Sequence, residues 1–173
     1  MRALHKGLLL GALQLALVMS LGAKLLIDRA RLPRAWVHVV PFDPDLPLRG
    51  RYVRLALEVP TLQMTGESTS PRLSPGRRFG QARLLLQDGQ LVAAPAAEPG
   101  TGLLVELRRS GDVTTARLAE PVLFFIPEHV RDPSRRGPDE ELWVEVTVPK
   151  KGIPRPIRLG VKKAGVITPL GLN

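Results

Sequence analysis

The sequence predicts a mainly β domain, a small antiparallel sandwich or curled sheet, preceded by one N-terminal transmembrane helix. Seventeen prolines and sixteen glycines in 173 residues indicate many short elements joined by turns, which is typical of β-rich folds. Beyond residue 35, several segments alternate apolar and polar residues with the period of half-buried strands, and none has a sustained helical period. We therefore divide the chain into a membrane anchor at 1–27, a basic tether at 28–34 and a β-rich domain at 35–173.

The N-terminal segment has the composition of a membrane anchor. Two cations precede an apolar run from Gly7 to Ala23 that has two polar interruptions. If the Lys24 ammonium reaches back to the interface, the run extends through Ile27 to about 20 residues, enough to span a bilayer. A cleaved signal peptide is the alternative, because it also has a basic start and an apolar stretch. The length of the run favours an uncleaved anchor.

Positive charges flank this segment on both sides, so charge counting alone does not decide its orientation. Arg2 and Lys6 favour an inside N-terminus, but four cations stand on the other flank at Lys24, Arg29, Arg31 and Arg34. Long domains cross the membrane with little regard to charge. We therefore expect a single-pass protein of a bacterial inner membrane, with its C-terminal domain in the periplasm.

Strand signals recur along the rest of the chain, with turns between them. Arg51–Val59 alternates so that Leu55 and Leu57 are expected to face the core. Pro121–Val130 opens with a continuous apolar run and is the densest core candidate of the sequence. Further strands are predicted at Ala35–Val40 and Leu142–Val148, and in two short segments near the C-terminus.

Two segments that combine glycine with aspartate predict hairpins. Asp88-Gly89 lies between two apolar runs, and Ser110-Gly111-Asp112 repeats the pattern between the next two. Both suit tight turns that need positive φ angles. By contrast, Thr61–Arg78 is rich in Ser, Thr, Pro and Gly and is predicted to be a long loop.

Composition and charge exclude several classes of function. The chain has no cysteine, which excludes disulfides, thiolate metal sites and cysteine nucleophiles. Of the net charge of +9, three charges belong to residues 1–30, so residues 31–173 carry +6. The basic residues form scattered pairs without interleaved aromatics, a pattern that does not indicate nucleic-acid binding. An anionic membrane surface is a possible partner, because cations near a bilayer are attracted to its acidic headgroups.

Candidate catalytic groups are few. Glu128-His129 is the best acid–base candidate, because a glutamate and a histidine at a strand exit could transfer protons if a pocket raised the glutamate pKa. Asp43-Pro44-Asp45 has the pattern of a turn and lacks the spaced oxygen ligands of a calcium loop. His38 stands in a predicted strand and is interpreted as structural. We therefore expect no metal and no cofactor.

Two short motifs resemble those of one bacterial family. Gly50, Tyr52 and Leu55 match three of the five fixed positions in the signature of the GDYXXLXY-domain proteins, and the family aspartate and last tyrosine are replaced here by Arg51 and Leu57. The preceding "FDPDLPLR", which contains Asp43, resembles the acidic lead-in of that family. A later "FVPE" motif is similar to Phe125, Ile126, Pro127 and Glu128.

The resemblance implies an anchored envelope domain, of a kind often encoded beside polytopic membrane proteins, and so implies a polytopic membrane protein as partner. It supplies no catalytic residues. In that context Gly50 is interpreted as a turn residue and Tyr52 as an amphipathic ring at the start of a strand. The leading hypothesis is a non-enzymatic accessory or binding module for a neighbouring integral membrane protein. The alternative is a membrane-anchored hydrolase that uses Glu128 and His129.

Overall fold

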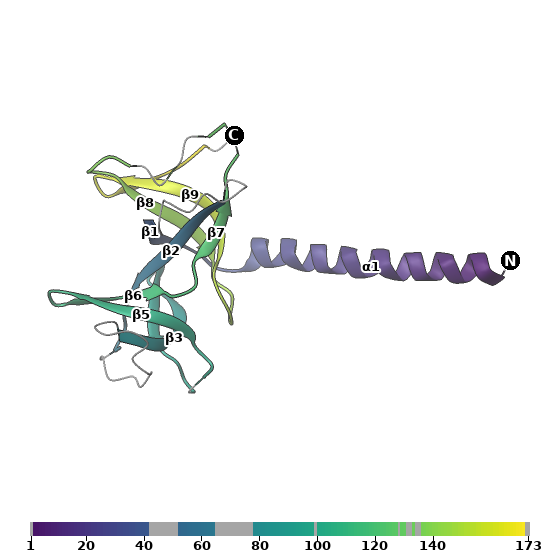
Figure 1. Cartoon of the computed structure of the whole chain (residues 1–173), viewed down its shortest axis with the longest axis horizontal. Coiled ribbons are helices and arrows are strands. Elements are labelled where there is room, and N and C mark those ends of the chain that lie inside the picture. Colours follow the sequence, from purple (N-terminus) through teal and green to yellow (C-terminus); the bar gives the residue numbers. More distant parts are fainter. Residues whose placement is uncertain are drawn as a thin grey trace. The chain divides into compact units, whose positions relative to one another are not determined.

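The computed structural model describes residues 2–41, 52–64, 78–98, 100–127, 129–130, 133 and 136–171. The chain forms two units, Met1–Leu32 and Pro33–Asn173 (Figure 1). The first contains one helix, α1 (Arg2–Arg31), so the residues at 28–31 of the predicted tether are helical. His5–Arg31 has a mean hydropathy of 1.9 in its most apolar window and is long and apolar enough to span a membrane.

The second unit is mainly β, as the sequence predicts. Within the described residues it contains ten strands: β1 (Arg34–Pro41), β2 (Tyr52–Pro60), β3 (Arg78–Gln87), β4 (Gln90–Pro95), β5 (Leu103–Ser110), β6 (Val113–Leu118), β7 (Val122–Phe125), β8 (Glu141–Thr147), β9 (Arg155–Lys163) and β10 (Val166–Pro169). They form one sheet in the order β10-β9-β8-β1-β2-β6-β5-β3-β4, and every pair of neighbours is antiparallel. β7 lies off this path and pairs with β2.

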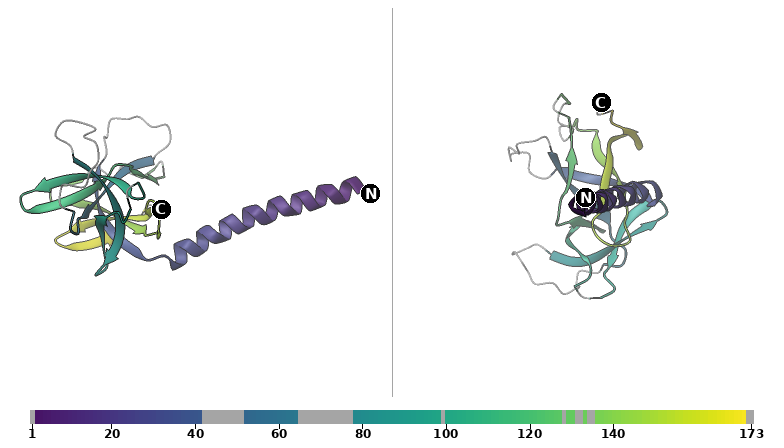
Figure 2. Two further views of the ribbon diagram at one scale, coloured as in Figure 1. Left: turned by 90° about the horizontal axis from the view of Figure 1, so that it is seen from below. Right: turned by 90° about the vertical axis from the view of Figure 1, so that its right-hand side faces the viewer.

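The sheet curls, so that its β4 edge returns to the middle strand β2. Thr61 forms a parallel bridge with Ala93 of β4, and the Leu62 N–H donates a hydrogen bond to the Ala93 carbonyl at 2.7 Å. In Figure 1, β2 runs between a group that contains β8 and β9 and a group that contains β3 and β5, and Figure 2 shows the curl from two further directions. The curl encloses the core with a single sheet.

Strand alternation explains the core. Leu55 and Leu57 of β2 are fully buried, as their spacing predicts, and they belong to one cluster with Val37 of β1, Val144 of β8 and Leu159 of β9. Both predicted hairpins are present, with Asp88-Gly89 between β3 and β4 and Gly111-Asp112 between β5 and β6. Met64, in the segment predicted as a long loop, is buried against the core, and residues 65–77 lie outside the described residues.

The prediction for Pro121–Val130 was wrong in one respect. Its apolar run is not a wholly buried strand: Val122 and Ile126 are buried, but Leu123 and Phe125 are more than half exposed, at 55% and 58%. β7 is only four residues long and lies beside β2, so alternate side chains face away from the core. Apolar content alone therefore overstated the burial of this segment.

Candidate functional site

The two motif segments meet in the sheet. β2 begins at Tyr52 and β7 ends at Phe125, and the antiparallel register places these two residues opposite each other. Their rings form an edge-to-face pair with centroids 5.4 Å apart. Leu123 is two residues from Phe125 and so projects from the same face of β7. We call Tyr52, Leu123 and Phe125 the Tyr52 patch.

The Tyr52 patch is an exposed apolar surface. Tyr52 is 50% exposed, so all three side chains reach solvent to a similar extent. Among the described strands, β2 is the one that pairs with β7, which leaves the opposite edge of β7 without a strand partner. Clustered apolar side chains beside an open strand edge are typical of surfaces that bind another chain.

The other predicted site residues do not join this patch or form a second site. Leu55 is buried in the core, opposite Val122 of β7. The Pro127 carbonyl accepts a hydrogen bond from the Val130 N–H, and His129 is exposed in the turn between them. Gly50, Asp43 and Glu128 lie outside the described residues.

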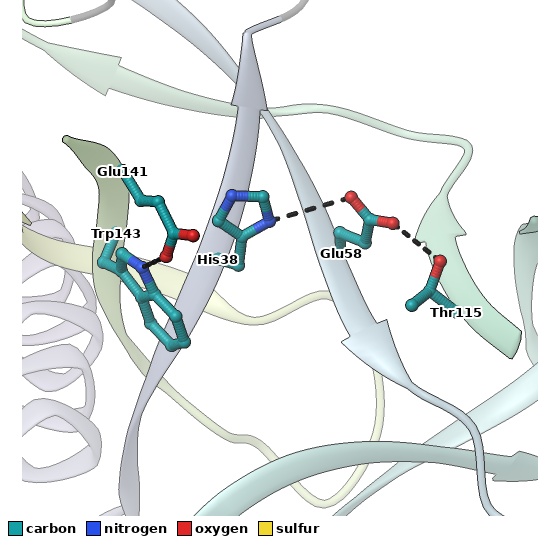
Figure 3. A network of polar contacts seen from close by, with 5 residues as sticks. All are labelled: His38, Glu58, Thr115, Glu141 and Trp143. Atoms are coloured by element: carbon teal, nitrogen blue, oxygen red, sulfur yellow. Dashed lines mark hydrogen bonds and ion pairs between the residues drawn. The ribbon is translucent and has the colours of Figure 1, made fainter. Parts of the chain in front are cut away.

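A polar network crosses the outer face of the central strands, and Figure 3 shows five of its members. Glu58 of β2 accepts a hydrogen bond from the Thr115 hydroxyl of β6 at 2.6 Å, and its second carboxylate oxygen lies 3.7 Å from His38 Nδ1 of β1. The His38 ring packs against Trp143 of β8 at 5.8 Å, and the Trp143 indole N–H donates to Glu141 at 3.0 Å. The network therefore links four strands.

The second tryptophan of the chain extends this face towards β9. The Arg158 guanidinium lies over the Trp36 ring at 5.5 Å, and its Nε donates a hydrogen bond to the buried Glu145 carboxylate at 2.6 Å. The Lys162 ammonium lies 4.6 Å from the centre of the Trp143 ring. Cation–π contacts at partly exposed sites stabilise by about 0.5–1 kcal/mol each. The Lys162–Trp143 pair joins the neighbouring strands β9 and β8, and the Arg158–Trp36 pair joins β9 to β1 across β8.

The geometry of this network does not fit nucleophilic catalysis. In a hydroxyl–imidazole–carboxylate triad, the hydroxyl contacts the imidazole, which takes up its proton. Here the Thr115 hydroxyl and the His38 imidazole both contact Glu58, so the carboxylate separates the two groups. Within the described residues, no group of three His, Asp or Glu side chains is placed to hold a metal ion.

His129, the described member of the predicted acid–base pair, does not line either of two pockets that described residues form. Two of the pockets lined by described residues have volumes of about 350 Å³, in the one that includes Leu104, and about 260 Å³, in the one that includes Met64. Neither His129 nor Tyr52 lines them. The His129 side chain is exposed to solvent.

Sequence reasoning missed the network for a definite reason. The alternation of side chains along a strand does place Trp36 and His38 on the same face of β1, and it places Trp143 on one face of β8. It does not show which strands are neighbours, and β1 and β8 are more than a hundred residues apart in the chain. The interpretation of His38 as structural agrees with its contacts in the sheet.

The chain was compared with protein-family models, with curated proteins and with solved structures, and none of the three comparisons found a match. Its function is therefore inferred from its own residues and their arrangement.

Proposed function

We propose that the protein is a single-pass, membrane-anchored envelope domain that acts as a non-enzymatic accessory or binding module for a neighbouring integral membrane protein. The observation that carries this proposal is the Tyr52 patch, an exposed apolar surface beside the edge of β7 with which no other described strand pairs. An extended segment of a partner could pair with that edge, and its side chains could pack on the patch.

The N-terminal helix supports the membrane part of the proposal. The side chains of α1 are exposed from His5 to Ile27, with Leu9 at 72% and Leu26 at 70%, and such an apolar surface is stable in a bilayer rather than in water. By analogy with the resembled family, the membrane is a bacterial inner membrane and the β domain lies in the periplasm. The partner is then a polytopic protein of the same membrane.

The resemblance to the GDYXXLXY-domain proteins agrees with this reading at one point. The two motif segments are about seventy residues apart in the sequence, and they supply opposite sides of the Tyr52 patch. The hydrolase alternative has less support. His129 is exposed outside both pockets, and the polar network around His38 is arranged to join strands.

A site-specific photocrosslink tests the partner. A photoreactive amino acid replaces Leu123 in the full chain expressed in its native membrane, and Leu86, which is 40% exposed on the β3–β4 hairpin, is the matched control position. We expect one adduct from position 123 whose second component is a multi-span membrane protein, and no such adduct from position 86. Tyr52→Ala with Phe125→Ala should reduce the adduct several-fold, because both rings are exposed and the fold does not depend on them.

Two outcomes would contradict the partner proposal. One is the absence of any membrane-protein adduct from position 123, and the other is the same set of adducts from both positions. Topology is tested separately, with alkaline phosphatase fused after Asn173. We expect enzyme activity and resistance to carbonate extraction, and an inactive fusion would exclude a periplasmic β domain.

A further inference from the structure

One pocket of the β domain is apolar and lies beside a basic loop. Its volume is about 350 Å³, at the lower end of the range for small-molecule sites. Its apolar lining comes from strand β5, from the end of β6 and the segment that follows it, and from the loop between β8 and β9. It consists of Leu103, Leu104, Leu118, Ala119, Pro121 and Ile153. One charged side chain, Glu120, also lines it.

The β8–β9 loop combines two cations with the apolar side chain that reaches the pocket. Lys150 and Lys151 are exposed, and no ion pair with another described residue holds either of them. Ile153 is partly buried against the core, and the following Pro154 is fully buried. The loop is thus fixed at its C-terminal end while its lysine pair remains free to contact a ligand.

This loop lies at the end of the β domain where the chain comes from α1. The domain begins at Pro33, whose carbonyl accepts a hydrogen bond from the Val148 N–H at 2.9 Å. Arg34 pairs with Thr147 in the sheet, and Val148 directly precedes the loop. Only Leu32 separates Pro33 from the last residue of α1, so the chain enters this end of the β domain directly after the anchor.

We propose that the pocket and the Lys150–Lys151 pair together bind an anionic phospholipid of the membrane that holds α1. The lysine ammonium groups would contact the headgroup phosphate, and part of an acyl chain would occupy the pocket. Charge complementarity carries the choice of ligand, because an apolar pocket alone would accept many occupants and the paired cations select an acidic one. Glu120 repels an anion, so the headgroup lies on the lysine side of the pocket.

This inference rests on the membrane anchoring in the proposed function, but it does not depend on the partner protein. Lipid at this loop would hold the β domain against the bilayer surface and limit the directions in which the Tyr52 patch can face. Each lysine near a membrane surface strengthens binding by about five-fold. Removing both should therefore weaken binding of the anionic lipid by roughly 10- to 30-fold.

A fluorescence-quenching experiment tests the site in the full chain. Because the chain has no cysteine, Leu104→Cys, at a pocket position that is 41% exposed, gives one site for a bimane label. The labelled chain is placed in nanodiscs that contain acyl-brominated phosphatidylglycerol or, at the same mole fraction, acyl-brominated phosphatidylcholine. We expect strong quenching with the anionic lipid and weak quenching with the zwitterionic one.

Charge variants identify the headgroup contact. Lys150→Gln with Lys151→Gln should reduce quenching by phosphatidylglycerol to the phosphatidylcholine level, and the corresponding Lys→Arg pair should preserve it. Arg108→Gln with Arg109→Gln is the matched control, since it removes two positive charges from the β5–β6 hairpin and should change little. Ala119→Phe, at an exposed position that lines the pocket, should exclude the acyl chain and reduce quenching with both lysines present.

The outcomes separate this inference from the proposed function. If the chain does not enter nanodiscs, the anchoring fails and the lipid site fails with it. If the chain enters nanodiscs but the two brominated lipids quench equally, the lipid site alone is refuted. It is also refuted if the Lys→Gln pair and the Arg→Gln pair reduce quenching equally. Displacement by inorganic phosphate, at an ionic strength matched with chloride, would show that an anion binds without an acyl chain and would also refute it. A label at Ala119→Cys repeats the measurement if the first labelled variant does not fold.

Discussion

At the scale of single residues, one glycine makes room for a tryptophan two strands away. Trp36 is on β1 and Gly160 on β9, and β8 lies between them in the sheet. A Cβ atom at position 160 would lie 2.7 Å from Trp36 Cζ3 and 3.1 Å from Ile167 Cγ2. The Trp36 ring thus extends across β8, where it also contacts Arg158. Gly160 is therefore a packing requirement of this face.

Gly160→Ala should lower the free energy of unfolding of the β domain by about 1–3 kcal/mol, because the new methyl group meets a rigid ring and a packed side chain. Denaturant unfolding monitored by circular dichroism measures the change. Gly137→Ala is the control, since a Cβ there meets nothing within 4 Å. Combining Gly160→Ala with Trp36→Leu should cost less than the sum of the two single changes, and strict additivity would show that the ring does not occupy this space.

At the scale of elements, two hairpins use the same backbone turn with different residues. The β3–β4 turn has Asp88 and Gly89 at φ angles of 51° and 77°, and the β9–β10 turn has Ala164 and Gly165 at 49° and 83°. Positive φ at both central positions fits the type I′ turn of a two-residue hairpin. Asp-Gly predicts that turn from the sequence, whereas Ala-Gly does not, because alanine disfavours the left-handed region.

Ala164→Asn should therefore raise the free energy of unfolding by about 0.5–1 kcal/mol, because asparagine adopts the left-handed conformation more readily than alanine. Asp88→Ala makes the reverse change in the matching turn and should destabilise by a similar amount. The midpoint of urea unfolding measures both changes in the free energy of unfolding, provided that the m-value stays constant. A destabilising Ala164→Asn would mean that the alanine methyl contributes more through packing than the backbone strain costs.

At the scale of the whole molecule, the anchor and the β domain are separate units. The hydrogen bond from the Val148 N–H to the Pro33 carbonyl and the pairing of Arg34 and Ala35 with β8 belong to the β domain. Ala35 is buried, at 3% exposure, so the domain begins within a few residues of the end of α1. The described residues of its core cluster all belong to the β domain itself.

A chain that starts at Pro33 should therefore fold without the anchor and unfold in one cooperative transition. A chain that starts at Trp36 loses the pairs of Arg34 and Ala35 with β8 and should be less stable by about 1–3 kcal/mol. Thermal unfolding of the two purified domains measures the difference. If the Pro33 chain proved unfolded, the helix would be part of the folding unit after all.

Much of the architecture could be predicted from local patterns. The apolar anchor, the alternation in Arg51–Val59 and the Asp88-Gly89 turn each depend on residues that are adjacent in the chain, and the structure contains all three elements. The exposed half of β7 could not be predicted, because whether Leu123 and Phe125 are covered depends on the strands around them. The Tyr52 patch was missed for the same reason, although Tyr52 and Phe125 were both singled out.

The sequence by itself determined the class of the protein: an apolar helix, then a β-rich domain whose strands and turns follow from period-two alternation and turn residues. Only the tertiary structure decided which residues meet. It placed Tyr52 against Phe125, Glu58 between Thr115 and His38, and Trp36 over Gly160. The physical reason is that alternation acts along one strand, whereas the pairing of distant strands depends on how the whole sheet encloses its core.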